Sequence, residues 1–117
     1  NSGSGLNLTG IGLGNFTEWL IKTYPGQESW RYQPAHNVFL LAYSETGILG
    51  ALMFIGFILA ILIPTTRKFI RSPDLTTAIP LLAMGCLLFI GLFDHFPWTL
   101  QQGRILWWGV LGLFLFD

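Results

Sequence analysis

The feature that most constrains this chain is a long apolar run near its middle. Between Val38 and Pro64 the sequence VFLLAYSETGILGALMFIGFILAILIP contains a single charged residue, Glu45. A helix that crosses the hydrocarbon core of a bilayer needs about 20 predominantly apolar residues. The stretch from Thr46 to Ile63 comes close to that length alone. The run therefore predicts a membrane-spanning helix.

The composition of the whole chain favours a membrane protein. Only 10% of the 117 residues are charged, whereas soluble domains usually carry about 25%. The net charge is zero and no basic patch is interleaved with aromatic residues, so nothing in the sequence indicates nucleic-acid binding. Cys86 is the only cysteine, and its place in an apolar run predicts a small, buried packing residue.

Two further apolar segments follow the first, and together they predict the fold class. We expect an all-α, polytopic membrane helical bundle with three transmembrane helices at about 38–64, 77–93 and 98–116, preceded by an outer-face segment over 1–37. The sequence DHFPW predicts a tight turn, with Pro97 in the first turn of the third helix. Because the chain lacks an initiator methionine and ends in an apolar stretch, we interpret it as part of a larger protein.

The distribution of charge predicts an orientation for these helices. Arg67, Lys68 and Arg71 are expected in a short loop between the first two spans, and cations concentrated in such a loop mark the cytoplasmic side. The amino-terminal segment and the DHFPW turn then lie on the outer face. Gly47 and Ala51, one helical turn apart, predict close packing between helices.

The outer segment contains one pattern typical of a surface helix. Asn15 and Glu18 have the spacing of a capping box. The sequence FTEWLIKTY that follows places its large apolar side chains near one helical face, which suits an amphipathic helix at the membrane surface. The preceding GIGLGN departs from the dinucleotide fingerprint, because its third glycine comes one residue early and no strand precedes it. We therefore expect a turn that seats the surface helix.

Ionisable and amide side chains stand directly before the long apolar run. His36 is the candidate catalytic residue, since an imidazole near the bilayer surface titrates near neutral pH and can exchange a proton. The alternative is an interfacial histidine that only hydrogen-bonds to backbone. Asn37 is a candidate helix cap or substrate ligand, and Arg31 and Arg104 are candidate phosphate ligands because guanidinium forms bidentate bonds to phosphate.

The remaining candidates are expected to have structural or supporting roles. Glu45 lies nine residues after His36 on the opposite helical face, so we expect it to pair with a cation on another helix, with Arg104 as the candidate. Asp94 is expected to face the positive start of the third helix, and His95 to lie at the membrane interface. Histidine spacing of the kind found in metal sites is absent, so no metal site is predicted.

The order of these features resembles the O-antigen ligase family of bacterial membrane proteins. The resemblance covers roughly Gly10 to Leu115, and it is carried by GIGLGNF, by PAHNVFLLAYSETGILG and by the two further apolar segments. Members of that family are polytopic inner-membrane glycosyltransferases that take a glycan from a polyprenyl diphosphate carrier on the outer face. The acceptor is lipid A core, a polysaccharide or a protein hydroxyl, and no metal, nucleotide sugar or other cofactor takes part.

The resemblance implies a role for one residue in particular. The key histidine of the family matches His36, whereas the arginines that hold the diphosphate lie mostly in helices outside this sequence, and Arg31 has no firm match. Two alternatives stay open. In the first, the chain is part of a transporter whose outer histidine senses pH or binds a solute. In the second, it is a packing scaffold for catalytic residues elsewhere.

Overall fold

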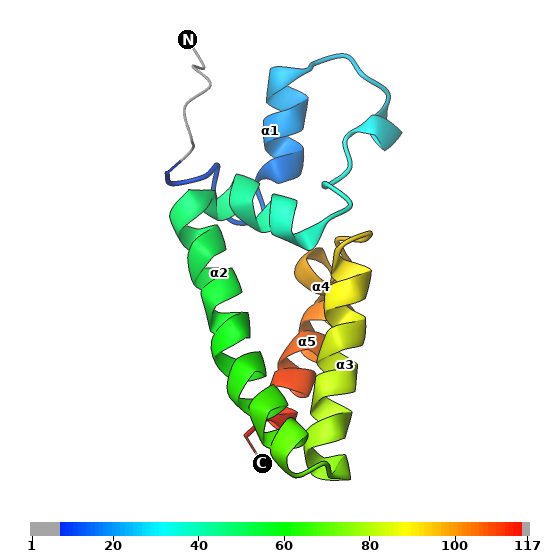
Figure 1. The fold of residues 1–117 in the computed structure, drawn as a ribbon. Coiled ribbons are helices and arrows are strands. Elements are labelled where there is room, and N and C mark those ends of the chain that lie inside the picture. The colour runs from blue at the N-terminus through cyan, green and yellow to red at the C-terminus, as the bar shows by residue number, and fades with distance from the viewer. Residues whose placement is uncertain (1–7, 116–117) are drawn as a thin grey trace.

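The chain folds as a set of helices with a small outer part and a longer bundle (Figure 1). The computed structural model describes residues 8–115, and every regular element in that range is helical. The elements are α1 (Phe16–Thr23), the 3-10 turn η1 (Ser29–Arg31), α2 (Val38–Arg71), α3 (Leu75–Gly91), α4 (Phe96–Thr99) and α5 (Gln101–Leu113). The predicted all-α class is confirmed for this part of the chain.

Helix α2 is bent near its start rather than straight. Gly47 has a φ of 74° and a ψ of −176°, which interrupts the helix. Figure 1 shows the first part of α2 lying across one end of the bundle, while the rest runs down beside α3. A left-handed φ favours glycine, so the glycine expected to serve close helix packing instead makes a bend.

The glycine-rich loop stabilises this bend through the backbone. The amide of Ile11 donates to the carbonyl of Ser44 at 3.0 Å, and the amide of Gly12 donates to that of Glu45 at 2.9 Å. Both carbonyls lie where the bend interrupts the helical ladder, so the loop satisfies acceptors that would otherwise be unpaired. Gly10 allows the approach, because a Cβ there would overlap the Glu45 carbonyl and the Gly47 amide.

The far end of α2 also differs from the prediction. The helix continues through Pro64 to Arg71, so Arg67, Lys68 and Arg71 occupy its last two turns instead of a loop. Proline removes one backbone hydrogen bond from a helix interior, and the Thr65 hydroxyl donates to the nearby Ile61 carbonyl at 3.0 Å. The connection to α3 is therefore short, with Ser72 ending α2 and Asp74 capping α3.

The three predicted spans correspond to helices of very different lengths. Within residues 8–115, α2 is the one helix long and apolar enough to cross a membrane, while α3 is a shorter apolar helix of 17 residues. The third predicted span is divided, because Leu100 is extended (φ −88°, ψ 142°) and separates α4 from the 13-residue α5. Pro97 does lie in the first turn of α4.

Helix α1 has the predicted place and length but not the predicted cap. The Asn15 side chain makes no hydrogen bond to the start of α1 and instead donates to the Ile11 carbonyl at 3.3 Å. Glu18 lies 3.7 Å from the Lys22 ammonium, one turn further along. The capping-box prediction is wrong because the glycine-rich loop, bound to α2, engages the Asn15 amide.

The interior of the bundle is formed where α2, α3 and α5 converge. Its buried side chains are Ile58 of α2, Met84 and Leu87 of α3, and Trp107, Val110 and Leu111 of α5. Cys86 is exposed, so the prediction that it packs inside is wrong. Much of the outward surface is apolar as well, including Met53 of α2 and Leu82 of α3, at 68% and 70% exposure.

Candidate functional site

Three ionisable side chains meet at the end of the bundle where α2 begins, and we call them the His36 cluster. His36 lies just before α2, and Asp94 and His95 lie in the turn between α3 and α4. Each offers one ligand atom within 4.8 Å of the others. The two imidazole centroids are 5.2 Å apart. Residues that the sequence assigned to separate roles therefore share one site.

Asn37 explains why these two segments meet. Its Oδ1 accepts hydrogen bonds from the amides of Phe39 and Leu40, both at 3.0 Å, so it caps α2. Its Nδ2 donates to the Leu92 carbonyl at the end of α3, also at 3.0 Å. One side chain thus starts α2 and ties that start to the turn that carries Asp94 and His95.

His95 is held by a pair of hydrogen bonds with Thr99. The His95 Nδ1 lies 2.7 Å from the Thr99 hydroxyl oxygen, and that hydroxyl donates to the His95 carbonyl at 3.2 Å. Both bonds form at once only when Nδ1 carries the ring proton, because the hydroxyl proton is used on the carbonyl. In the neutral ring this leaves Nε2 as the nitrogen that carries the lone pair.

Asp94 is oriented by the backbone of the same turn. Its Oδ1 accepts a hydrogen bond from the Phe96 amide at 2.9 Å, at the start of α4. This bond occupies one carboxylate oxygen and leaves the other available. His36 and Asp94 are exposed and His95 is partly buried, so the cluster is accessible to solutes.

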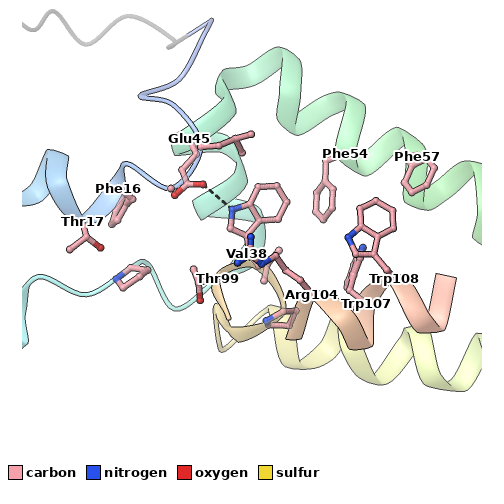
Figure 2. A pocket seen from close by; sticks show the side chains of 15 residues that line it. Phe16, Thr17, Val38, Glu45, Phe54, Phe57, Thr99, Arg104, Trp107 and Trp108 are labelled. Atoms are coloured by element: carbon pink, nitrogen blue, oxygen red, sulfur yellow. Dashed lines mark hydrogen bonds between the residues drawn. The ribbon is translucent and has the colours of Figure 1, made fainter. Parts of the chain in front are cut away.

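Beside the His36 cluster lies a cavity of about 650 Å³ between α1, α2, α4 and α5. Its walls are mostly aromatic and apolar, and Figure 2 shows Phe54, Trp107 and Trp108 along one stretch of it. Phe54 stacks on Trp107 with ring centroids 5.8 Å apart. Thr99 lines the cavity and also holds His95, so the cavity and the cluster are neighbours.

Glu45 faces into this cavity but does not form the ion pair expected of it. It is 3% exposed, and its Oε2 accepts a hydrogen bond from the Trp98 indole Nε1 at 2.9 Å (Figure 2). No ion pair joins Glu45 to Arg104, although both line the cavity. The bend at Gly47 explains the change of partner, because it lays the first part of α2 over α4.

The two candidate phosphate ligands have different positions. Arg104 of α5 lines the cavity. Arg31 lies in η1, where its Nη1 donates to Gln27 Oε1 at 3.2 Å and its guanidinium lies 5.1 Å from the Trp30 ring centroid. Arg31 contributes to neither the His36 cluster nor the cavity lining.

Sequence reasoning missed the residues that support the site. Trp98 and Thr99 follow Pro97 directly, in a stretch that resembles an ordinary interfacial turn. Thr99 bonds to His95, four residues before it, and Trp98 bonds to Glu45 in a distant part of the chain. The isolated Glu45 was the one signal for Trp98, because a buried carboxylate requires a donor.

Comparisons with known proteins add no relative to this description. No protein-family model matches the chain, and no curated protein or solved structure matches it.

Proposed function

We propose that this chain belongs to a membrane glycosyltransferase of the O-antigen ligase type. It would move a glycan from a polyprenyl diphosphate carrier to a hydroxyl of lipid A core, a polysaccharide or a protein, on the outer face of the bacterial inner membrane. The observation that supports this most is the adjacency of an exposed histidine to a large aromatic cavity that carries a guanidinium. The sequence resemblance points the same way.

In this proposal His36 is the general base. Its imidazole accepts the proton of the acceptor hydroxyl while that oxygen attacks the anomeric carbon of the glycan. The bond between this carbon and the carrier's phosphate oxygen breaks, and the diphosphate leaves with the bonding electrons. General-base catalysis of this kind contributes about 10²–10⁴ in rate.

The cavity would bind the carrier. The guanidinium of Arg104 suits the departing diphosphate, because planar bidentate donors match phosphate oxygens. The walls formed by Phe54, Trp107 and Trp108 offer the apolar, aromatic surface that an isoprenoid chain requires. Asn37 would orient the acceptor only indirectly, since both ends of its amide are already bonded. Arg31 lies outside the cavity and is proposed to contact membrane lipid or the glycan instead.

The same proposal treats α2, α3 and α5 as membrane spans. The part of α2 after the bend, Ile48 to Arg71, is 24 residues long (71 − 48 + 1) and would extend roughly 36 Å at 1.5 Å per residue. This exceeds the roughly 30 Å of a hydrocarbon core. Helices α3 and α5 are shorter, and bilayers accommodate short spans by thinning locally.

The test is to replace His36 with alanine in the full polypeptide and to follow glycan transfer from a polyprenyl diphosphate donor. We expect the rate to fall by about 10²–10⁴, since the base is removed, with an unchanged circular dichroism spectrum. Gln33→Ala is the matched control, because Gln33 is an exposed polar residue of the same loop. Transfer near the parent rate by a folded His36→Ala variant would contradict the proposal and favour the scaffold or transporter alternatives.

A further inference from the structure

We propose that His36, Asp94 and His95 bind one divalent metal ion of intermediate softness, with Zn²⁺ as the representative ion. Two imidazoles and one carboxylate form a ligand set that Zn²⁺ accepts in proteins, with a fourth position left for water. Mg²⁺ and Ca²⁺ prefer oxygen ligands, so the two histidines select against them. The sequence hides this site, because His36 lies far from the other two residues along the chain.

The distances in the cluster are close to those that an ion needs. Ligand atoms at about 2.0–2.1 Å from a tetrahedral Zn²⁺ lie about 3.3 Å from one another. The ligand atoms of the three groups lie within 4.8 Å of one another, so they must approach by up to about 1.5 Å (4.8 − 3.3). The His36 side chain is exposed and can close this gap by rotation, while Asn37 ties the start of α2 to the end of α3 through its bond to the Leu92 carbonyl.

The hydrogen bonds around the cluster are those that metal ligands usually have. A ligating histidine normally donates its other ring N–H to a neighbouring acceptor, and a ligating carboxylate is itself hydrogen-bonded. Thr99 accepts from His95 Nδ1, which leaves Nε2 of the neutral ring as the nitrogen able to bind an ion, and Phe96 donates to one oxygen of Asp94. Two of the three ligands are therefore oriented before an ion arrives.

A bound ion would affect both the fold and the proposed reaction. It would connect the start of α2 to the turn between α3 and α4. It would also occupy the imidazole lone pair that accepts a proton in the proposed function, so Zn²⁺ should inhibit glycan transfer. This last consequence rests on the proposed function, whereas metal binding itself does not.

The binding test uses ZnCl₂ and the full polypeptide in detergent micelles, without glycan or carrier. We expect one Zn²⁺ per chain in a calorimetric titration. Asp94→Asn and His95→Asn, which keep the bonds to Phe96 and Thr99, should each raise the Kd at least about 10-fold. Thr99→Val should raise it about 10–100-fold, as losses of such supporting bonds do. Asp74→Asn is the matched control, because Asp74 also accepts a bond from a backbone amide near a helix start but has no histidine nearby in sequence. The Kd of this variant for Zn²⁺ should not change.

The visible absorption spectrum of bound Co²⁺ is an independent test of the same site. Replacing Zn²⁺ by Co²⁺ should produce the strong visible absorption of a four-coordinate ion, and His36→Ala should abolish it. A Kd unchanged by the Asp94, His95 and Thr99 replacements, or only the weak spectrum of hydrated Co²⁺ in the parent chain, would overturn the proposal.

A transfer assay separates this inference from the proposed function. Inhibition of transfer by Zn²⁺, reversed by a chelator, supports both. Stoichiometric Zn²⁺ binding without inhibition keeps the metal site and removes His36 from the role of base. Undiminished transfer in a chain that binds no Zn²⁺ overturns the metal site alone.

Discussion

At the scale of single residues, the chain contains the same hydrogen bond in two surroundings. Trp98 Nε1 donates to Glu45 Oε2 at 2.9 Å inside the cavity, and Trp30 Nε1 donates to Glu28 Oε2 at 3.2 Å on the surface. Glu45 is 3% exposed, whereas Glu28 and Trp30 are both exposed. Glu45 is shielded from water and Trp98 partly so, whereas both partners of the surface bond are exposed, so the Glu45–Trp98 bond should contribute more to stability.

We expect Glu45→Ala to lower the free energy of unfolding by about 0.5–1.5 kcal/mol, the usual net contribution of a hydrogen bond, because the Trp98 donor is only partly buried. Glu45→Gln should cost less, because its amide oxygen still accepts from Trp98. Glu28→Ala is the matched control and should have little effect. Reversible unfolding in detergent micelles, followed by circular dichroism, measures all three. Equal losses for Glu45→Ala and Glu28→Ala would show that burial does not strengthen this bond.

The sequence identified the unusual residues but not their partners. Glu45 and His36 were recognised because ionisable side chains are rare at such positions. Trp98 and the meeting of His36 with Asp94 were not, because they depend on contacts between segments far apart in the chain. Thr99 was missed although its partner, His95, is only four residues away. Asn37 was an exception, since the helix cap that it forms is local.

At the scale of elements, Asp74 shows how a local pattern determines a helix start. Its carboxylate accepts from the Thr77 amide at 2.8 Å, from the Thr76 hydroxyl at 2.8 Å and from the Thr77 hydroxyl at 2.9 Å. The Thr77 amide first, then these hydroxyls, lower the pKa of Asp74 from 3.8 to about 2. The folded chain therefore favours the ionised carboxylate at the start of α3.

The lowered pKa predicts the pH dependence of this cap. Since the folded pKa lies below the unfolded value, the stabilisation is complete above pH 3.8 and is lost as the pH falls through about 2. Thr76→Val removes one donor and should raise the pKa of Asp74, which NMR titration of its carboxyl carbon measures. Thr66→Val, at an exposed threonine on α2, is the control. An unchanged pKa in Thr76→Val would rule out the hydroxyl as a cause.

Element boundaries were less predictable wherever a distant segment decides them. The apolar run correctly predicted a long helix. It did not predict the bend, because nothing local marks Gly47 as different from any small residue in a membrane helix. Its bend depends on amides of Ile11 and Gly12 that are supplied from the glycine-rich loop. The break at Leu100 likewise allows α4 to pack on α5, where a Cβ at Gly103 would overlap the Phe96 carbonyl.

At the scale of the whole molecule, the apolar outer surface and the extended shape belong together. The molecule measures 56 × 28 × 18 Å, and Met53, Leu82 and Phe89 project outward from the bundle at 64–70% exposure. Large exposed apolar surfaces mark contact with lipid or another protein. The His36 cluster lies at one end of this surface, and the cations that end α2 lie at the other (Figure 1).

This arrangement predicts that the two ends of α2 lie on opposite sides of a membrane. Two exposed serines allow a matched test in a Cys86→Ala background: Ser29→Cys in η1 and Ser72→Cys at the end of α2. A membrane-impermeant maleimide should label Ser29→Cys on intact cells and Ser72→Cys only after permeabilisation, because an apolar helix separates them. Native Cys86, exposed on α3 toward the expected lipid, should resist labelling in both conditions. Equal labelling of the two serine variants on intact cells would mean that α2 does not cross the bilayer, and would place the His36 cluster and the α2 cations on the same side of it.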